Sequence, residues 1–300
     1  KSPFTMILAD EFQDSSRARI QLLKSLANCR EKRAHLCVVG DDWQGINRFA
    51  GSDIAVMTEF DKVFKHATTL SLSTTFRCPQ HLCEVSSRFI QQNPVQTRKA
   101  VRTTNPLTRT PLLAFALKDE SGIPGLVESQ LEDLNGYVRD GRIQPIKGRR
   151  VSAMLLGRYR SDRPASLDQW KARFGDVLDL EFKTAHGSKG LEADYVFILN
   201  VIEGTRGFPS QIQDDPVLQM AMPAPDTFPF AEERRLFYVA MTRARRQVRF
   251  FTVNGKPSQF LIELARTKDI VIEAMEGEVA EPCPKCQRGV LVLRRGPYGE

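Results

Sequence analysis

The sequence predicts an α/β fold with parallel sheets, arranged in two domains. Apolar runs alternate with amphipathic helical patterns, an order typical of the βαβ units of a parallel sheet. Two such runs, FTMILA and HLCVV, end close to acidic residues. A polar stretch rich in Arg, Thr and Pro, over 91–111, separates two of these α/β patterns. A chain of 300 residues is long enough for two domains, each with its own core.

The first α/β pattern covers the chain up to the polar stretch. We expect strands over 4–9, 35–39 and 68–73, with a capped helix beginning near Ser15 between the first two. A second helix should begin at Pro79, a favoured first-turn residue, and stop at Asn93 and Pro94. Its apolar face is formed by Leu82, Val85, Phe89 and Ile90.

The second α/β pattern begins with the run PLLAFAL. Further strands are expected over 151–156, 180–185, 194–201 and 247–253. One amphipathic helix carries Val127, Leu131, Leu134 and Val138 on its apolar face. Another is predicted over 231–246, with an inward face of Leu236, Phe237, Val239 and Ala240.

Composition narrows the class of protein. The net charge of +7 is compatible with a polyanionic partner, although many proteins without one are equally basic. The apolar runs are far shorter than the roughly 20 residues of a membrane span, and the start does not resemble a signal peptide. Single cysteines at Cys29, Cys37, Cys78 and Cys83 form no disulfide framework, so we expect a cytoplasmic protein without a membrane partner.

Asp10, Glu11 and Asp14 follow the first predicted strand. Clustered carboxylates repel one another unless a cation or hydrogen-bond donors compensate their charge. Mg²⁺ prefers hard oxygen ligands and is typically held by one or two carboxylates together with nucleotide phosphates. Asp10 could therefore hold the ion while Glu11 orients or deprotonates an attacking water. For two acids alone, a solvated loop after a strand is the plainer alternative.

Five segments change that balance. ADEFQD, VVGDDWQGINRFAG, LSTTFR, FKTAHGSKGLEADYVFILNVIEG and EERRLFYVAMTRAR resemble motifs II to VI of UvrD/Rep-like superfamily 1A DNA helicases, in the same order. The resemblance implies two RecA-like P-loop NTPase motor domains, the first incomplete. It also implies hydrolysis of ATP with Mg²⁺ at the interdomain cleft, coupled to 3′–5′ movement on single-stranded or partly duplex DNA. The implied boundaries are 1–92, a connection over 93–110, a second motor over 111–266 without a large insertion, and a tail over 267–300.

The resemblance assigns roles in ATP hydrolysis residue by residue. Asp10 matches the magnesium ligand and Glu11 the catalytic base. Gln44 matches the residue that senses the γ-phosphate, and Arg77 and Arg243 match the two arginines that reach it. Without the motifs, Gln44 would be a surface amide, and each arginine an ordinary solvated side chain.

Two further residues match the part of the site that holds the nucleoside. Phe76 resembles the aromatic residue that stacks on adenine, where relatives more often carry Tyr. Glu192 resembles the acid that accepts a hydrogen bond from the ribose. Without the motifs, a core Phe and a surface carboxylate are the ordinary alternatives.

The DNA-binding assignments follow in the same way. Phe49 resembles an aromatic on which an unpaired base stacks, and Arg48 would either pair with a phosphate or brace its loop. Thr184, His186 and Lys189 resemble backbone contacts in KTAHGSKG, whose small residues would let a phosphate approach the main chain. A structural histidine is the alternative for His186.

A phosphate-binding loop of the form GxxxxGK[ST] is absent from the 300 residues. In the family this loop precedes motif II, so we expect it before residue 1, and we expect this chain alone to be nearly inactive. Cys283 and Cys286 have the spacing of half a zinc ribbon, whose intact form would bind Zn²⁺.

Two other functions stay open at this stage. One is a non-unwinding helicase-like factor that binds RNA polymerase, and the other is a zinc-ribbon DNA-binding protein. Replication, repair or transcription proteins are the expected protein partners.

Overall fold

The computed structural model describes residues 4–28, 34–65, 67–105, 112–145 and 148–275. The chain forms two compact units, and each is drawn from several segments. The first unit comprises Lys1–Ser73, Ile90–Ala100 and Gln213–Tyr238, and the second comprises Thr74–Phe89, Val101–Ile212 and Val239–Glu300. Cys283 and Cys286, with the predicted zinc ribbon, lie outside the described residues.

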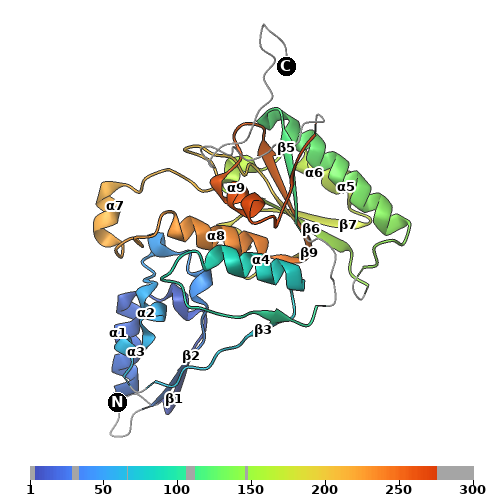
Figure 1. Ribbon diagram of the computed structural model, residues 1–300. Helices are drawn as coiled ribbons and strands as arrows, with labels where there is room; N and C mark the ends of the chain where they lie inside the picture. Colours follow the sequence, from blue (N-terminus) through green and yellow to red (C-terminus); the bar gives the residue numbers. More distant parts are fainter. Residues whose placement is uncertain (1–3, 29–33, 66, 106–111, 146–147, 276–300) are drawn as a thin grey trace. The chain divides into compact units, whose positions relative to one another are not determined.

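The first unit contains the predicted βαβ unit (Figure 1). Strand β1 (Met6–Ala9) pairs in parallel with β2 (His35–Val38), and α1 (Arg17–Asn28) connects them. The register places Ala9 opposite Val38, so the turns that follow both strands emerge at one edge of the sheet. Phe12, Ile20 and Val56 form a small core beneath this edge. The other helices of the unit are α2 (Ala55–Thr58), α3 (Phe60–Val63), α7 (Pro216–Ala221) and most of α8 (Ala231–Met241).

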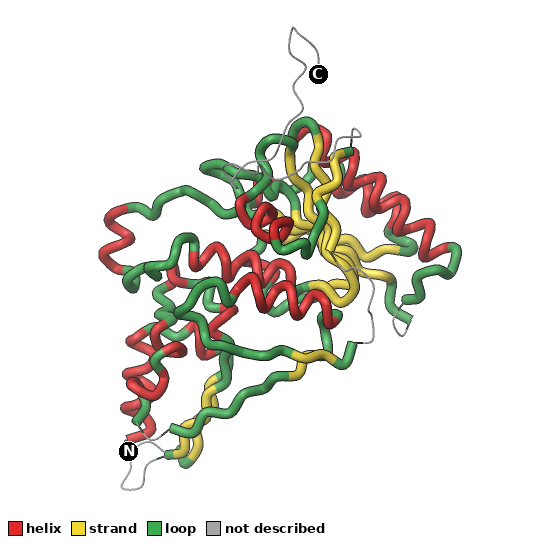
Figure 2. The backbone as a smooth tube through the Cα atoms, in the orientation of Figure 1, coloured by secondary structure: helices red, strands yellow, loops and turns green. Residues whose placement is uncertain are grey.

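The strand predicted over 68–73 is wrong. This stretch runs as a loop (Figure 2), and only β3 (Thr74–Thr75) follows it. Leu70 and Leu72 are 87% and 91% exposed, so the alternating pattern has no sheet face to bury them. Strand propensity in a run of Thr, Leu and Ser therefore does not suffice without a neighbouring strand to pair with.

A parallel sheet of six strands forms the second unit, in the order β10-β5-β9-β8-β6-β7. Every neighbouring pair in it is parallel. The sheet confirms the expected α/β architecture and all five strands predicted after the polar stretch. The strands are β5 (Leu112–Leu117), β6 (Val151–Gly157), β7 (Leu178–Thr184), β8 (Ala193–Ile198), β9 (Ala244–Val253) and β10 (Ile272–Ala274).

Helices cover both faces of this sheet. Helices α5 (Ile123–Arg139) and α6 (Leu167–Phe174) share a core with alternate residues of the strands, and α9 (Gln259–Arg266) lies across the other face (Figure 1). Every residue of β8 is buried, which explains its continuous run of large, mainly apolar residues over Tyr195–Ile198. Burial on both faces is the usual condition of a parallel sheet.

The units differ from the predicted domain boundaries at residues 92 and 111. Thr74–Phe89 belongs to the second unit, where β3 pairs with β4 (Arg102–Thr103). Helix α4 (Gln80–Ile90) also packs there, because the Phe89 ring meets Phe260 edge to face with centroids 5.1 Å apart. Local sequence patterns identify these elements but carry no information about which unit buries them.

Two ends of the second α/β pattern also differ from expectation. The helix predicted over 231–246 stops at Met241, because β9 already begins at Ala244 and pairs with Ala193 of β8. Strand β10, which falls in the predicted tail over 267–300, pairs in parallel with β5. Across the described ranges, no helix combines the length and apolar character needed to cross a bilayer.

Candidate nucleotide and nucleic acid sites

The predicted catalytic acids lie in the turn after β1. Asp10 and Glu11 are both exposed, and the Glu11 amide donates to Asp10 Oδ1 at 2.8 Å. Glu11 adopts a left-handed conformation, with φ 49° and ψ 43°. Such a conformation costs a non-glycine residue about 1 to 3 kcal/mol, and outliers of this kind concentrate at functional sites.

Gln13 links the two acidic turns. Its side chain is almost fully buried, and its Nε2 donates to Glu11 Oε2 at 2.5 Å. Its Oε1 accepts from the Asp41 amide of the second turn, at 2.9 Å. A Cβ at Gly40 would lie 2.9 Å from this Oε1, so a side chain there would force the Gln13 amide to move. Gln13 is thus one residue that the motif-based predictions did not include. The glutamine among the acids of DEFQD was the signal in the sequence that could have identified it.

The turn after β1 suits a magnesium ion. Asp10 presents an exposed carboxylate, the hard oxygen ligand that Mg²⁺ prefers. No group of three or more His, Cys, Asp or Glu residues that could hold a metal occurs in the part of the chain that the structure describes. A site of one carboxylate completed by phosphates and water matches this sparse donor set.

Gln44 lies in the turn after β2. Its Nε2 donates to Asp41 Oδ2 at 2.8 Å, and Asp41 Oδ1 accepts from Lys99 Nζ at 2.6 Å. With Asp10 and Glu11 linked to Asp41 through Gln13, the first unit brings its three predicted hydrolytic residues to one edge of the β1–β2 sheet.

The Arg48 guanidinium binds three residues of the first unit. It donates to the Pro223 carbonyl at 3.2 Å and pairs with Glu232, 3.4 Å away, and with Asp214. Its main-chain amide also donates to Glu232, at 3.0 Å. With these contacts, Arg48 braces its own loop. A contact between Arg48 and a DNA phosphate stays a prediction.

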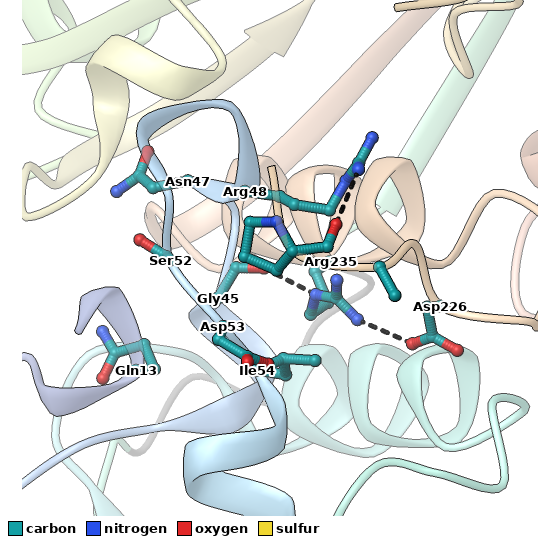
Figure 3. Close-up of a pocket in the computed structure, with 11 residues that line it drawn as sticks. Gln13, Gly45, Asn47, Arg48, Ser52, Asp53, Ile54, Asp226 and Arg235 are labelled. Atoms are coloured by element: carbon teal, nitrogen blue, oxygen red, sulfur yellow. Dashed lines mark hydrogen bonds and ion pairs between the residues drawn. The ribbon is translucent and has the colours of Figure 1, made fainter. Parts of the chain in front are cut away.

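A second arginine, Arg235, holds the same loop from the side of a small cavity of about 20 Å³ (Figure 3). Its Nε donates to the Gly45 carbonyl at 2.6 Å. Its Nη1 reaches Asp226 Oδ2 and Gln96 Oε1, both at 3.2 Å. Arg235 is only 2% exposed, and its hydrogen bonds hold the segment Gln213–Tyr238 against the loop that contains Gly45.

Phe49 stands on the outside of this braced loop. It belongs to the short 3₁₀ helix Arg48–Ala50 and is 64% exposed. A large exposed ring on a rigidly held loop is suited to stacking on an unpaired base.

In the second unit, Glu192 joins two arginines. Arg77 Nε donates to Glu192 Oε2 at 2.7 Å, and Arg245 Nη2 donates to Oε1 at 2.5 Å. Asn105 Nδ2 donates to the carbonyls of both arginines, at 2.7 and 2.9 Å. Phe76, beside Arg77 in sequence, is 79% exposed rather than part of a core. Sequence patterns marked Arg77 and Glu192 but not their direct contact.

The pKa of Glu192 should be visible in acid unfolding. The hydrogen bonds from Arg77 and then Arg245 lower this pKa from 4.5 to about 2. The ion pairs therefore contribute their full stability above pH 4.5 and lose it as the pH falls toward 2. We expect the urea midpoint of Glu192→Gln to fall less than that of the wild type between pH 5 and pH 3.

Glu181→Gln is the control for that measurement, because it removes an exposed carboxylate from β7, a strand of the six-stranded sheet in the second unit. If Glu192→Gln and the wild type lost stability equally over this range, the ion pairs would not carry the pH dependence.

Arg243 is buried, in contrast to Arg77. Its Nε donates to the Val239 carbonyl at 2.8 Å and its Nη1 to the Leu191 carbonyl at 3.2 Å. The second contact places its guanidinium beside the residue that precedes Glu192. Glu192 and Arg243 directly precede β8 and β9, and Arg77, which lies between β3 and α4, reaches Glu192 within the same unit.

Thr184 ends β7, and His186 and Lys189 belong to the tight turn that follows it. Gly187 N donates to Thr184 Oγ1 at 3.1 Å, and Lys189 N donates to the His186 carbonyl at 3.2 Å. Gly190 has φ +78°, a conformation that glycine adopts without steric cost. The turn presents main-chain groups together with a basic side chain, as a phosphate contact requires.

Comparisons with known proteins agree with these motifs. Residues 1–65 match the model of the UvrD/REP helicase N-terminal domain, and residues 167–254 match the UvrD-like helicase C-terminal domain. DNA helicase IV of Escherichia coli K12 is 39% identical over 272 residues, which are 90% of this chain and 37% of that protein. ATP-dependent DNA helicase PcrA of Bacillus subtilis is 34% identical over 102 residues, covering 34% of this chain and 13% of PcrA.

Among solved structures, the C-terminal domain of a possible DNA helicase from Lactobacillus plantarum aligns with a TM-score of 0.36 and 18% identity. The alignment covers 62% of this chain and 92% of that domain. The two family models and the relative that matches nearly the whole chain agree with one another. The chain belongs to the UvrD-like family of DNA helicases.

Proposed function

We propose that this chain is part of an ATP-dependent DNA helicase that couples hydrolysis to 3′–5′ movement on single-stranded DNA. The observation that carries the proposal is the Gln13 bridge. It connects the left-handed Glu11 to the turn that contains Gln44. A base and a phosphate-sensing loop joined by one buried amide can respond together to a bound triphosphate.

In this proposal the side chains divide the work of hydrolysis. Glu11 accepts a proton from the attacking water, and Gln44 orients the groups around the γ-phosphate. Arg77 and Arg243 stabilise the charge that spreads over the phosphate oxygens. Phe76 stacks on the adenine and Glu192 binds the ribose. Mg²⁺ held by Asp10 would supply charge neutralisation when bound.

The DNA-binding part of the proposal assigns base stacking to Phe49 and backbone contacts to Thr184, His186 and Lys189. Arg48 contributes by holding the loop that carries Phe49. Zinc binding through Cys283 and Cys286, a cytoplasmic location and partners in replication, repair or transcription complete the proposal.

The test is made on the full-length gene product. We expect single-stranded DNA to stimulate its ATPase, and a duplex with a 3′ tail to be unwound in preference to one with a 5′ tail. Absence of stimulation, with retained binding to a protein such as RNA polymerase, would instead support a non-unwinding factor. DNA binding that tolerates loss of both Asp10 and Arg243 and ignores nucleotide would support a zinc-ribbon DNA-binding protein.

Replacing Phe49 with alanine should uncouple hydrolysis from movement. One stacked base is worth roughly 1 to 3 kcal/mol, so strand movement per ATP should fall while ATPase without DNA stays near wild type. The ring is 64% exposed, so its loss should change folding stability little. The measurement is the number of nucleotides travelled per ATP hydrolysed.

Phe4→Ala is the matched control, because Phe4 is another exposed ring of the same unit. Wild-type unwinding by Phe49→Ala would remove the stacking role from this residue.

A further inference from the structure

One lysine contacts both acids of the turn after β2. Lys99 Nζ lies 2.6 Å from Asp41 Oδ1 and also pairs with Asp42 Oδ1. Both partners and the lysine belong to the first unit, although 58 positions separate Lys99 from Asp41 in sequence. Lys99 therefore offsets the repulsion between two adjacent carboxylates at the turn that carries Gln44.

Asp42 anchors the lysine's own segment. Its side chain is 1% exposed, and its Oδ2 accepts from Gln96 Nε2 at 2.9 Å and from the Thr97 amide at 2.8 Å. These bonds hold residues 96–99 against the turn. The remaining oxygen of this buried carboxylate, Oδ1, is the one that meets Lys99.

Asp41 passes the contact on to Gln44. Its Oδ1 accepts from Lys99, while its Oδ2 accepts from Gln44 Nε2 at 2.8 Å. A bond to Nε2 sets which end of the amide meets the carboxylate, so Oε1 must lie on the other side of the amide group. The orientation of Gln44 is thus tied to the position of Asp41, and Asp41 is tied to Lys99.

Trp43 limits where the lysine can lie. The Lys99 ammonium sits 5.0 Å from the centre of the Trp43 ring, and the indole Nε1 donates to the Thr97 carbonyl at 2.9 Å. Burial by itself lowers the pKa of Lys99, but Asp41 and Asp42 outweigh burial and raise it, so the ammonium stays charged at neutral pH.

We propose that Lys99 is a positioning residue for Gln44, acting through Asp41. This inference rests on the proposed function, because it assigns Lys99 to the γ-phosphate sensor of that same site. Without the ammonium, Asp41 loses this ion pair and no longer holds the Gln44 amide in one orientation. Gln44 then meets the γ-phosphate in its working geometry only part of the time.

Lys99→Met tests the proposal, because it keeps a long apolar side chain and removes the charge. In the full-length gene product with single-stranded DNA, we expect kcat for ATP to fall about 10- to 100-fold. KM for ATP should stay near the wild-type value, because Gln44 acts on the transition state rather than on ATP binding. Lys99→Arg should restore most of the turnover.

Lys62→Met is the matched control. Lys62 pairs with Glu59 in the same unit at 3.1 Å, but both side chains are at least half exposed and both residues lie outside the motif segments. It should leave kcat unchanged. An equal loss in both lysine variants would mean a general effect of charge, and would overturn the proposal.

A second variant distinguishes a loss of turnover from a folding defect. Lys99→Met combined with Asp42→Asn leaves no buried carboxylate uncompensated, and the asparagine oxygen can still accept from Gln96 and Thr97. This double variant should melt near the wild-type temperature and still show the low kcat. Recovery of full turnover by it would show that Lys99 serves only the fold.

A double-mutant cycle with Gln44→Ala gives the decisive readout. If Lys99 acts through Gln44, adding Lys99→Met to Gln44→Ala should lower kcat by less than about twofold more. Independent, multiplying losses would overturn the proposal. A wild-type protein without DNA-stimulated ATPase would instead reject the proposed function, which separates the two failures.

Discussion

Glu11→Gln in the full-length gene product is expected to lower the rate of ATP hydrolysis by about a hundred- to ten-thousandfold. The amide cannot accept the proton of the attacking water at neutral pH. The substitution preserves shape, and the glutamine oxygen can still accept the bond from Gln13 Nε2. The fold and the binding of single-stranded DNA should therefore persist. Steady-state ATPase and DNA-binding titrations measure the two effects separately.

Asp14→Asn is the control for this experiment. Asp14 is a third acid of the same turn, and the change removes a carboxylate in the same way while leaving Glu11 in place. It should alter turnover far less than Glu11→Gln. Undiminished turnover in Glu11→Gln would refute the assignment of Glu11 as the base.

Arg77→Ala is expected to reduce kcat by about a thousandfold or more, the usual cost of losing an arginine finger. The variant should fold, because Glu192 keeps its bond with Arg245. ATP binding should weaken much less than turnover, since the arginine stabilises charge that develops in the transition state. Single-turnover kinetics with DNA present measure the chemical step directly.

Arg245→Ala provides a closely matched comparison. Both arginines bind the same carboxylate, so each substitution removes one guanidinium and one bond to Glu192. Only Arg77 carries the predicted finger, so Arg245→Ala should keep turnover within about tenfold of wild type. Similar losses in the two variants would trace the effect to Glu192 and contradict the finger assignment.

Much of the fold was accessible from local patterns. Apolar spacing directly predicted the βαβ unit of the first α/β pattern. It also predicted the helix that buries Leu82, Val85 and Phe89. The strands of the second sheet follow from apolar runs that parallel sheets bury on both faces. The segment 68–73, for which a strand was wrongly predicted, has residue types that favour strands. Among the described residues, however, the structure places no strand beside it with which it could pair.

The residues of the candidate site likewise divide into those that the sequence indicated and those that only the structure revealed. The resemblance to the family's motifs pointed to Glu11, Gln44, Arg77 and Glu192, because it assigns a role to each matching position in the sequence. Lys99 and Arg235 could not be found in this way. Their partners lie 58 and 190 positions away, and a polar stretch or a helical arginine carries no mark of such a contact.

By itself, the sequence determined the family and the α/β class, since these depend on motif residues and local apolar patterns, and it supplied the residues that we propose for hydrolysis and stacking. Only the tertiary structure decided that Gln13 joins the two acidic turns, that Arg48 braces its loop and that Arg77 and Arg245 share Glu192. Such contacts join segments far apart in the chain. Their geometry is set by strand register and packing, which no short stretch of sequence encodes.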